Sequence, residues 1–499
     1  MLVVASPFSF PSVSVSIGIS EIEADMVEQV KTRPSPLGDA ISVQNDRVTV
    51  LREADLASPK MDALVREAVF GTGESRDYSR WLIWEIGATV GVRPASINGL
   101  YLARGRGETH GFTVPAINVR GAAYDTARSI FRTAIKLNAG AFLLEIARSE
   151  IGYTDQRPAE YVTAMLGAAL REGFRGPVFI QGDHFQVNSK KFAVDPSAEV
   201  GAVKQLALEA ITAGFYNIDV DTSTLVDLSQ PDLSAQQRLN YETCVDITRY
   251  IRELEPKGVT ISVGGEIGEV GTQNSTVHEL RAFMDGFNRT LANRSPGTAG
   301  LSKISVQSGT SHGGVVLPDG SIAEVALDLD TLAQLSKVAR EEYGMAGAVQ
   351  HGASTLPDGA FHHFPRTETA EIHLATNFQN MLFDHLPNAL RLEVYDWLRD
   401  NAKDERKATD TDEQFFYKTR KKALGPFKRR LWDLPDDVKA AVAKAYDAKF
   451  EFLFTQLGVA NTAEAVREHV KAVRLHRPMP GTAGYETVAA APDDTDLSD

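Results

Sequence analysis

The 499 residues include 43% apolar residues, enough to bury a large core, and the length predicts two or more domains or one barrel with additions. The formal net charge of -14 argues against nucleic acid or an anionic membrane as the main partner, but it allows an anionic small substrate. The single cysteine, Cys244, excludes an internal disulfide framework and favours a reducing compartment. No apolar run reaches the roughly 18–20 residues that cross a bilayer. We therefore expect a cytoplasmic protein.

Sequence patterns divide the chain into five regions. Segments rich in proline, serine and charge without periodicity are typical of a chain with no fixed structure, whereas apolar residues spaced by three and four predict helices. The predicted regions are a disordered or linker leader (1–50), a small helical N-terminal region (51–108), a barrel (109–390), a C-terminal helical extension (391–476) and a disordered tail (477–499). The last helix of the extension, in residues 437–458, is long enough to pack against a partner subunit.

The barrel region alternates short apolar segments with amphipathic helical patterns. The expected strands are FTVPAINV (112–119), AFLLEIA (141–147), PVFIQGD (177–183), FYNIDVD (215–221), VTISVGGE (259–266), KISVQSG (303–309), AGAVQHG (346–352) and EIHLAT (371–376). Eight such strands with intervening helices match the size of a (β/α)8 TIM barrel. The alternative, a doubly wound open sheet, usually has fewer strands and a glycine-rich turn after the first strand, which residues 118–121 lack.

Titratable side chains gather where the expected strands end. Enzymes with this barrel place their chemistry at the C-terminal ends of the strands. Four such ends carry a metal-type ligand, namely His184, Glu266, His312 and His351. A single histidine at a strand end is more often a hydrogen-bonded structural residue, but four ligands at one rim favour a site for zinc or a similar divalent ion.

Asp183 directly precedes His184 and has two possible roles. Its carboxylate can orient a ligand histidine through a hydrogen bond, or it can act on a substrate hydroxyl as a general base. We favour the general base, because a metal that polarises a carbonyl serves C–C cleavage or proton abstraction next to a ketone.

These motifs resemble the class II (metal-dependent) fructose/tagatose-bisphosphate aldolase family, from about residue 107 to residue 458. The matching segments are GFTVPAINV (111–119), GDH (182–184), DVDTST (219–224), GGEIG (264–268), GTSHGGV (309–315) and QHGAS (350–354). The resemblance implies a (β/α)8 barrel with a C-terminal helical extension. It also implies a cytoplasmic lyase of carbohydrate metabolism such as glycolysis, with a homodimer or higher homo-oligomer as the expected assembly. Such an enzyme cleaves a ketose phosphate or bisphosphate reversibly through a metal-stabilised enediolate, giving dihydroxyacetone phosphate and an aldehyde.

The resemblance also assigns roles to individual residues. Asp183 takes the position of the catalytic acid/base. The metal ligands fall on His184, Glu266, His312 and His351, for Zn2+ or another divalent ion such as Co2+, Mn2+ or Fe2+. The substrate-binding positions are Asn118, Gly313, Gly352, Ser354 and Thr376.

Several positions depart from the family pattern. His373 and Ala375 stand in the last strand where the family has an asparagine and an aspartate. Gln273 and Asn274 lie in the loop where an acidic proton donor is expected, and Glu269 is the candidate to replace it. These changes weaken fructose-1,6-bisphosphate as a named substrate more than they weaken metal-dependent aldol chemistry.

Three basic residues near the rim are candidate anion contacts. Arg148 follows the second strand, where the family has a small polar residue. Lys190 and Lys191 follow His184, and they either meet a phosphate or carboxylate or belong to a solvated loop.

Two alternatives to the aldolase remain open. The altered last strand is compatible with a metal-dependent epimerase, or with an aldolase for a related sugar or sugar acid. The missing loop acid is compatible with a non-catalytic aldolase-like partner subunit, against which the retained ligand set argues.

Overall fold

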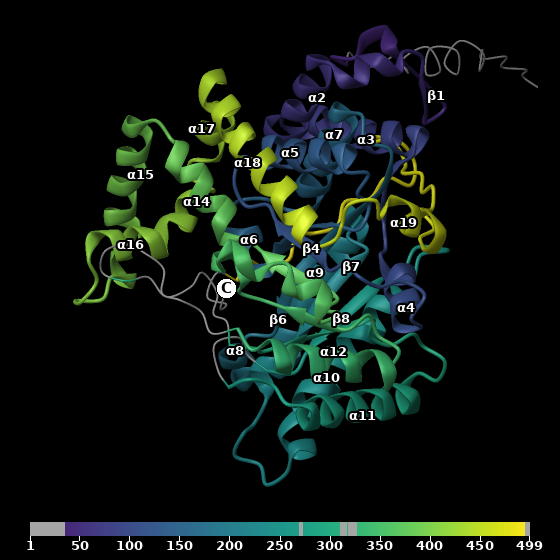
Figure 1. The fold of residues 1–499 in the computed structure, drawn as a ribbon. Coiled ribbons are helices and arrows are strands. Elements are labelled where there is room, and N and C mark those ends of the chain that lie inside the picture. Colours follow the sequence, from purple (N-terminus) through teal and green to yellow (C-terminus); the bar gives the residue numbers. More distant parts are fainter. Residues whose placement is uncertain (1–34, 269–272, 310–316, 318–326, 495–499) are drawn as a thin grey trace, which may run out of the picture.

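The computed structural model describes residues 35–268, 273–309, 317 and 327–494 (Figure 1). Its centre is a closed barrel of eight parallel strands, in which β6 pairs with both β5 and β7 and thereby closes the sheet. The barrel strands are β4 (Val114–Asn118), β5 (Leu143–Ala147), β6 (Gly176–Gln186), β7 (Asn217–Asp221), β8 (Ser262–Glu266), β9 (Lys303–Val306), β10 (Ala348–Gln350) and β11 (Glu371–Leu374). Each lies within or overlaps the segment expected from the sequence, so the (β/α)8 TIM barrel is confirmed.

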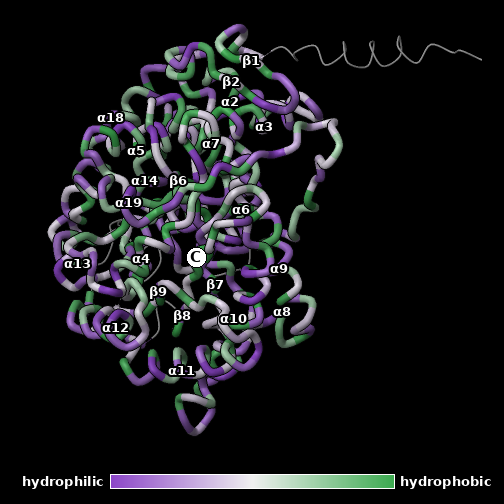
Figure 2. Tube along the Cα trace, turned by 90° about the vertical axis from the view of Figure 1, so that its right-hand side faces the viewer, coloured by the Kyte–Doolittle hydropathy of each residue, from purple (hydrophilic) through white to green (hydrophobic). Residues whose placement is uncertain are grey.

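The outer layer consists of helices that follow the strands. The main ones are α5 (Ala123–Lys136), α6 (Arg148–Tyr153), α7 (Pro158–Glu172), α8 (Ser189–Val194), α9 (Pro196–Ala213), α10 (Leu233–Glu253), α11 (Val277–Arg294), α12 (Leu329–Glu341), α13 (His363–Arg366) and α14 (Thr376–His385). In Figure 2 the outer helices alternate between hydrophilic and hydrophobic colours along their length. Helices with this alternation bury one stripe on the sheet and leave the other in water.

The N-terminal region is helical in part. It contains α2 (Pro59–Phe70), α3 (Gly73–Val90) and α4 (Asn98–Gly105), as the spacing predicted. Two features were missed. Residues expected as linker form a hairpin, β1 (Ile41–Gln44) with β2 (Arg47–Val50), closed by the left-handed residues Asn45 and Asp46. The short strand β3 (Val92–Ala95) pairs in parallel with the first half of β6, below the point where β7 takes over.

Helix α4 closes the N-terminal end of the barrel. Leu100 and Tyr101 pack into a separate apolar cluster with inward residues of the strands, including Val114, Leu143 and Phe179. The catalytic rim must therefore be the opposite, C-terminal end. In Figure 1, α4 and the lobe that follows α14 lie on opposite sides of the barrel.

The C-terminal extension is helical, as expected. It contains α15 (Asn388–Asn401), α16 (Asp412–Thr419), α17 (Lys428–Trp432), α18 (Asp436–Gln456) and α19 (Ala463–His469). The long helix α18 packs against α5 and α14 of its own chain, with Tyr446 and Phe450 buried. Its apolar face is therefore used within the chain. Within the described residues, no helix is long and apolar enough to span a membrane.

Residues 477–494 correct the prediction of a disordered tail. Arg477 lies over the indole of Trp84, 3.3 Å from the ring centroid to its guanidinium carbon, and its main-chain oxygen accepts a hydrogen bond from Trp81. Further along, Asp494 is 2% exposed. Composition predicted disorder here because the partners that order the tail are scattered over distant helices.

Candidate active site

The interior of the barrel is built from alternate residues of each strand, because side chains in a strand point to opposite faces with a period of two. Along β5, β6 and β7 the inward positions form three layers. The lowest carries Leu143 and Phe179 together with Asn217, the middle one carries Glu145, Gln181 and Asp219, and the uppermost, at the rim, includes Asp183 and Asp221.

A bulge in β6 turns two adjacent residues toward the site. Neighbours in a regular strand face opposite ways, but the register between β6 and β7 gains one residue in β6 between Gly182 and Phe185. His184 there adopts a left-handed φ of 38°. A Cβ on Gly182 would lie 2.4 Å from the Phe185 ring, so the bulge requires glycine. This local distortion brings both Asp183 and His184 to the rim.

Three of the predicted metal ligands meet at the rim. Donor atoms of His184, Glu266 and His351 lie within 4.8 Å of one another, and all three side chains are buried. His184 Nδ1 is 3.5 Å from Glu266 Oε2, and His351 Nδ1 is 3.9 Å from Glu266 Oε1. The fourth predicted ligand, His312, lies outside the described residues.

His373 belongs to the same cluster, which the sequence analysis did not foresee. Its ring centroid is 4.2 Å from that of His351, and its Nδ1 is 3.2 Å from Asp183 Oδ1. His373 shares the inward face of β11 with Glu371, two residues earlier. The period-two rule applied to the last strand would have placed it here.

Asp221 is the second group that was missed. Its Oδ2 lies 3.0 Å from His184 Nδ1 and accepts a hydrogen bond of 2.6 Å from Gln186 Nε2. A carboxylate in this position orients the imidazole of a metal ligand. The signal was available, because Asp221 is the last residue of β7.

The middle layer is a network of ion pairs and hydrogen bonds, and His373 joins it to the rim through Glu371, with 2.7 Å from Nε2 to Oε1. Lys303 Nζ is fully buried and donates to Gln181, at 2.8 Å, to Asp219, at 2.9 Å, and to Glu371, at 2.5 Å. Tyr101 of α4 also donates to Glu371. A Cβ on residue 264 would lie 2.3 Å from Asp219, which is why β8 has glycine there.

Charge at the rim is unevenly distributed among the histidines. Burial lowers the pKa of His351, and the neighbouring His373 and His184 lower it further, so the His351 imidazole is neutral. Burial also opposes protonation of His184 and His373, but Asp183 and other carboxylates outweigh it and raise the pKa of both well above the usual range.

The acids of the rim respond to the same neighbours. Burial raises the pKa of Asp183, yet the cationic His184 and His373 outweigh it and hold the pKa well below its usual range. Burial, reinforced by Asp221, raises the pKa of Glu266 well above its usual value. Burial likewise raises the pKa of Asp221, yet His184 outweighs it and lowers the pKa to about 2. Asp183 and Asp221 are therefore the ionised carboxylates of the rim, and Glu266 is one that a bound cation would help to ionise.

The donor set fits a divalent metal ion. Imidazole nitrogens and a carboxylate from three separate strands converge, and neutral His351 is in the form that binds metal. Three carboxyl groups of the rim, on Asp183, Asp221 and Glu266, lie there without a lysine or arginine beside them in the described structure. A bound cation would take the place of the protons on His184 and Glu266.

The predicted substrate-binding residues that the structure describes lie at the same rim. Ser354 Oγ accepts a hydrogen bond of 2.5 Å from Ala375 N, which joins the turn after β10 to the start of α14 at Thr376. Gly352 begins that turn with a φ of 67°. Gly313 lies outside the described residues.

Asn118 is engaged within the protein. Its Nδ2 donates to Glu150 Oε2 at 2.6 Å, and its Oδ1 accepts from Arg120 Nε at 3.2 Å. These contacts use one N–H and one oxygen lone pair of the amide and fix its orientation.

Arg148 is not a free anion contact, as the sequence had suggested. It is 3% exposed and donates to Glu199 Oε1 and to the main-chain oxygen of Gln186, both at 2.6 Å. Lys191 pairs with the carboxylate of Asp494 at 2.9 Å, and both Lys190 and Lys191 are exposed.

The loop that lacks the family acid is described in part. Asn274 donates to Asp328 at 3.0 Å and is exposed. Glu269, the candidate replacement, lies outside the described residues.

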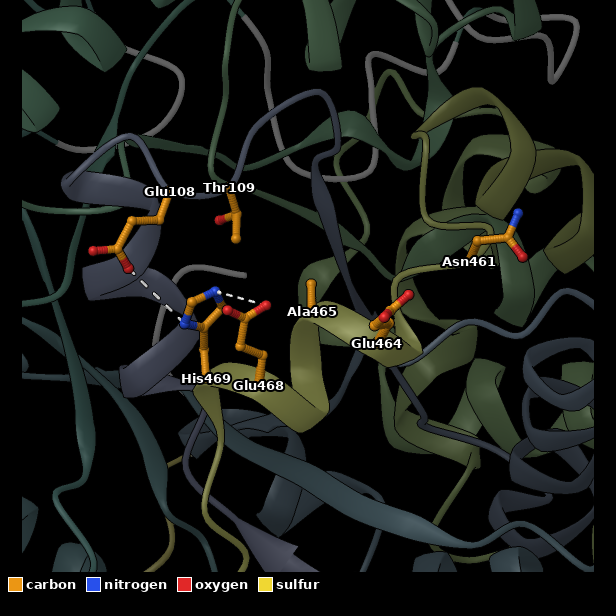
Figure 3. Close-up of a pocket in the computed structure, with 7 residues that line it drawn as sticks. All are labelled: Glu108, Thr109, Asn461, Glu464, Ala465, Glu468 and His469. Atoms are coloured by element: carbon orange, nitrogen blue, oxygen red, sulfur yellow. Dashed lines mark ion pairs between the residues drawn. The ribbon is translucent and has the colours of Figure 1, made fainter.

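A surface cavity of about 390 Å³ lies elsewhere (Figure 3). It is formed by residues of α19 and by Glu108 and Thr109, which precede β4 and therefore mark the N-terminal end of the barrel. Its histidine, His469, faces Glu108 and Glu468, each at 3.9 Å. The cavity lies at the N-terminal end of the barrel, whereas the rim cluster lies at the C-terminal ends of the strands, so the two are separate.

Comparisons with known proteins agree with this architecture. A structure described as a probable tagatose 6-phosphate kinase from Sinorhizobium meliloti 1021 is similar with a TM-score of 0.50 at 15% identity, covering 69% of this chain and 100% of that one. The fructose-bisphosphate aldolase of Campylobacter jejuni has a TM-score of 0.44 at 16% identity, covering 74% and 97%. The fructuronate-tagaturonate epimerase of Cohnella laeviribosi has a TM-score of 0.49 at 13% identity, covering 85% of this chain and 90% of that one.

At such low identity the Sinorhizobium structure shows a shared fold. No curated protein matches the sequence. The family model of class II fructose-bisphosphate aldolase matches residues 105–430, which is more than half of the chain and includes every barrel strand. The chain therefore belongs to the class II fructose-bisphosphate aldolase family.

Proposed function

We propose that the protein is a metal-dependent aldehyde-lyase that reversibly cleaves a ketose phosphate or bisphosphate, of the fructose or tagatose type, into dihydroxyacetone phosphate and an aldehyde. The observation that carries this proposal is the convergence of His184, Glu266 and His351 from three strands onto one point of the catalytic rim. Family membership supplies the reaction class. By the same family argument we place the reaction in cytoplasmic carbohydrate metabolism and expect a homodimer.

The metal would be held by His184, Glu266 and His351, together with His312. Zinc fits this donor set, and cobalt, manganese or iron(II) are the alternatives. When bound, the ion supplies a Lewis acid that polarises the substrate carbonyl.

Asp183 moves the proton in this scheme. Its carboxylate is ionised and lies at the rim beside the ligand His351, 3.7 Å from Oδ1 to Nε2. A base in this position accepts the proton of a substrate hydroxyl as the C–C bond breaks, and returns it in the reverse direction.

The phosphate end of the substrate would meet the start of α14. A helix N-terminus presents unpaired N–H groups to an anion, and here it is joined to the Gly352–Ser354 turn by the hydrogen bond to Ser354. Asn118 and Gly313 complete the predicted contacts.

One observation favours a second candidate, an epimerase or an aldolase acting on a related sugar or sugar acid. His373 stands where the family has asparagine, and its imidazole lies 3.2 Å from the carboxylate of Asp183. A site with both a carboxylate and an imidazole can remove and return a proton on a carbon next to a carbonyl, which is the proton transfer that epimerisation requires.

A substrate panel tests these alternatives. Ketose bisphosphates, ketose monophosphates and hexuronates are assayed for cleavage and for epimerisation, with and without a chelator, on the wild type and on Asp183→Ala. The aldolase proposal expects chelator-sensitive cleavage, which Asp183→Ala reduces by about 10²–10⁴-fold. Epimerisation without cleavage would favour the second candidate. No turnover of any substrate by the metal-loaded protein would favour a non-catalytic partner subunit.

A further inference from the structure

The C-terminal segment ends, in the described structure, with a carboxylate buried beside the catalytic rim. Asp494 is 2% exposed, and its Oδ2 lies 2.9 Å from Lys191 Nζ, 3.4 Å from Asn188 Nδ2 and 3.7 Å from Arg148 Nη2. Lys191 belongs to α8 and Arg148 to α6, and Figure 1 shows both helices on the flank of the barrel beside β6. Three polar side chains thus converge on one carboxylate.

Further contacts hold the segment that precedes Asp494. Gln205 of α9 donates to Ala489 O at 2.9 Å, and Ala491 N donates to Glu209 Oε2 at 2.8 Å. Arg157 pairs with Asp493 at 2.5 Å and also with Glu209. The segment is therefore fastened to α9 at several points before it delivers Asp494.

The charges around Asp494 explain why a buried carboxylate is tolerated. A buried carboxylate is destabilising unless it is paired and hydrogen-bonded. Arg148 and Lys191 carry two positive charges, while Glu199 supplies one negative charge through its contact with Arg148. Asp494 supplies the second negative charge. Without Asp494 these side chains would carry a net positive charge and present an amide donor and a buried guanidinium. Those are the features of an oxyanion-binding site.

This place connects to a metal ligand through a chain of contacts. Arg148 donates to the main-chain oxygen of Gln186 at 2.6 Å. Gln186 in turn donates to Asp221, which lies 3.0 Å from His184 Nδ1. The position of Asp494 is thereby linked to the orientation of His184.

We propose that Arg148, Lys191 and Asn188 form an oxyanion-binding site for a small carboxylate, that the chain fills it with its own Asp494, and that its occupation positions His184. The binding of a carboxylate by these three side chains does not depend on the function proposed above. The effect of that binding on His184 rests on the proposed function. Asp494 and Arg148 are positioning residues, since neither contacts the rim cluster directly.

The test removes the internal carboxylate and then replaces it. Asp494→Ala is prepared in the full-length chain, with Asp493→Ala as the matched control, because Asp493 forms a more exposed ion pair with Arg157. Hydrogen–deuterium exchange is followed at the amides of Asn188, Lys190 and Lys191, which donate to Glu199 or to the Asn188 side chain. Affinity for Zn2+ is measured in parallel. The exchange and the affinity measurements are each repeated with sodium formate and with sodium chloride at equal ionic strength.

The proposal expects faster exchange at these three amides in Asp494→Ala and slower exchange again with formate but not with chloride. It also expects Zn2+ affinity to fall by about threefold to tenfold, less than the roughly 10–100-fold typical of a direct partner of a ligand, and to recover with formate. Asp493→Ala should show neither the loss nor the rescue.

The oxyanion site is overturned if formate leaves the exchange of Asp494→Ala unchanged, or if Asp493→Ala responds in the same way. The link to His184 is overturned if Zn2+ affinity is the same in Asp494→Ala and the wild type. A wild-type protein that binds no Zn2+ would refute the proposed function, while the exchange data with formate would still decide the oxyanion site.

Discussion

The rim layer and the middle layer of the barrel contain the same kinds of side chain, but they are satisfied differently. In the middle layer Lys303 donates hydrogen bonds to three acceptors. Glu371 accepts hydrogen bonds from Lys303, Gln181 and Tyr101. At the rim, histidines and carboxylates face one another, with neutral His351 between them and no lysine or arginine near their carboxylates among the described residues.

This difference separates a structural network from a binding site. Buried polar groups that complete one another's hydrogen bonds hold an interior in one arrangement. A buried cluster of acids and imidazoles in which the ligands still hold protons is instead completed by a cation that displaces those protons. The predictions that follow compare matched changes in the two layers.

The largest expected effect comes from replacing one carboxylate by an amide in each layer. Asp183→Asn removes the proposed base, and its turnover should fall by about 10²–10⁴-fold while its metal content stays at the wild-type level. Asp219→Asn, in the middle layer, should change turnover by less than about tenfold. Steady-state kinetics and metal analysis of both variants make the comparison, and equal losses of turnover would remove the distinction between the layers.

Lys303→Met should destabilise the fold strongly. The change keeps most of the side-chain volume but leaves Asp219 and Glu371 buried without their cation, and breaking a buried pair in this way costs about 3–5 kcal/mol. Lys136→Met removes a pair with Glu451 from a side chain that is 63% exposed, and should cost less than about 1 kcal/mol. Urea unfolding measures both free energies. A Lys303→Met protein as stable as the wild type would show that the network does not hold the barrel.

Metal should stabilise the folded protein through the rim. At a free Zn2+ concentration of 100 times Kd, binding raises the free energy of unfolding by about 2.7 kcal/mol. This gain should vanish in His351→Ala and persist in Asp219→Asn. Thermal unfolding with and without Zn2+ gives the result, and stabilisation retained in His351→Ala would place the metal elsewhere.

The last comparison concerns the pH dependence of metal binding at the rim. The pKa values of His184 and Glu266 are raised, so both hold protons that a metal must displace, whereas His351, with its lowered pKa, holds none near neutrality. Apparent affinity should therefore rise with pH, by up to about tenfold per pH unit for each displaced proton, and the rise should continue above pH 6.5. Titrations between about pH 6 and pH 8 test the sign, and a flat profile would contradict these protonation states.

Sequence patterns predicted the barrel well because its strands are fully buried and appear as short apolar runs at regular intervals. They missed the β1–β2 hairpin, whose four-residue strands carry exposed positions, and β3, which is only four residues long and contains an arginine and a proline. They also missed the order of the C-terminal tail, since Asp494 is placed by Arg148 and Lys191, more than 300 residues away in the chain.

At the site, residues at strand ends were predictable and residues deeper in the strands were not. Asp183, His184, Glu266 and His351 were expected at the rim, and the structure brings all four there. Lys303 was indistinguishable from a charge that flanks a strand, because only closure of the barrel shows that the first residue of β9 faces inward. The roles of the ligands and of Asp183 stay predictions.

The most direct test of the central claim is the metal content of the purified protein. After loading with Zn2+ and removal of the excess, the wild type should retain about one metal per chain, and His351→Ala should retain far less. A wild-type value below about 0.1 metal per chain, or a His351→Ala protein with the same content as the wild type, would contradict a metal site at the rim.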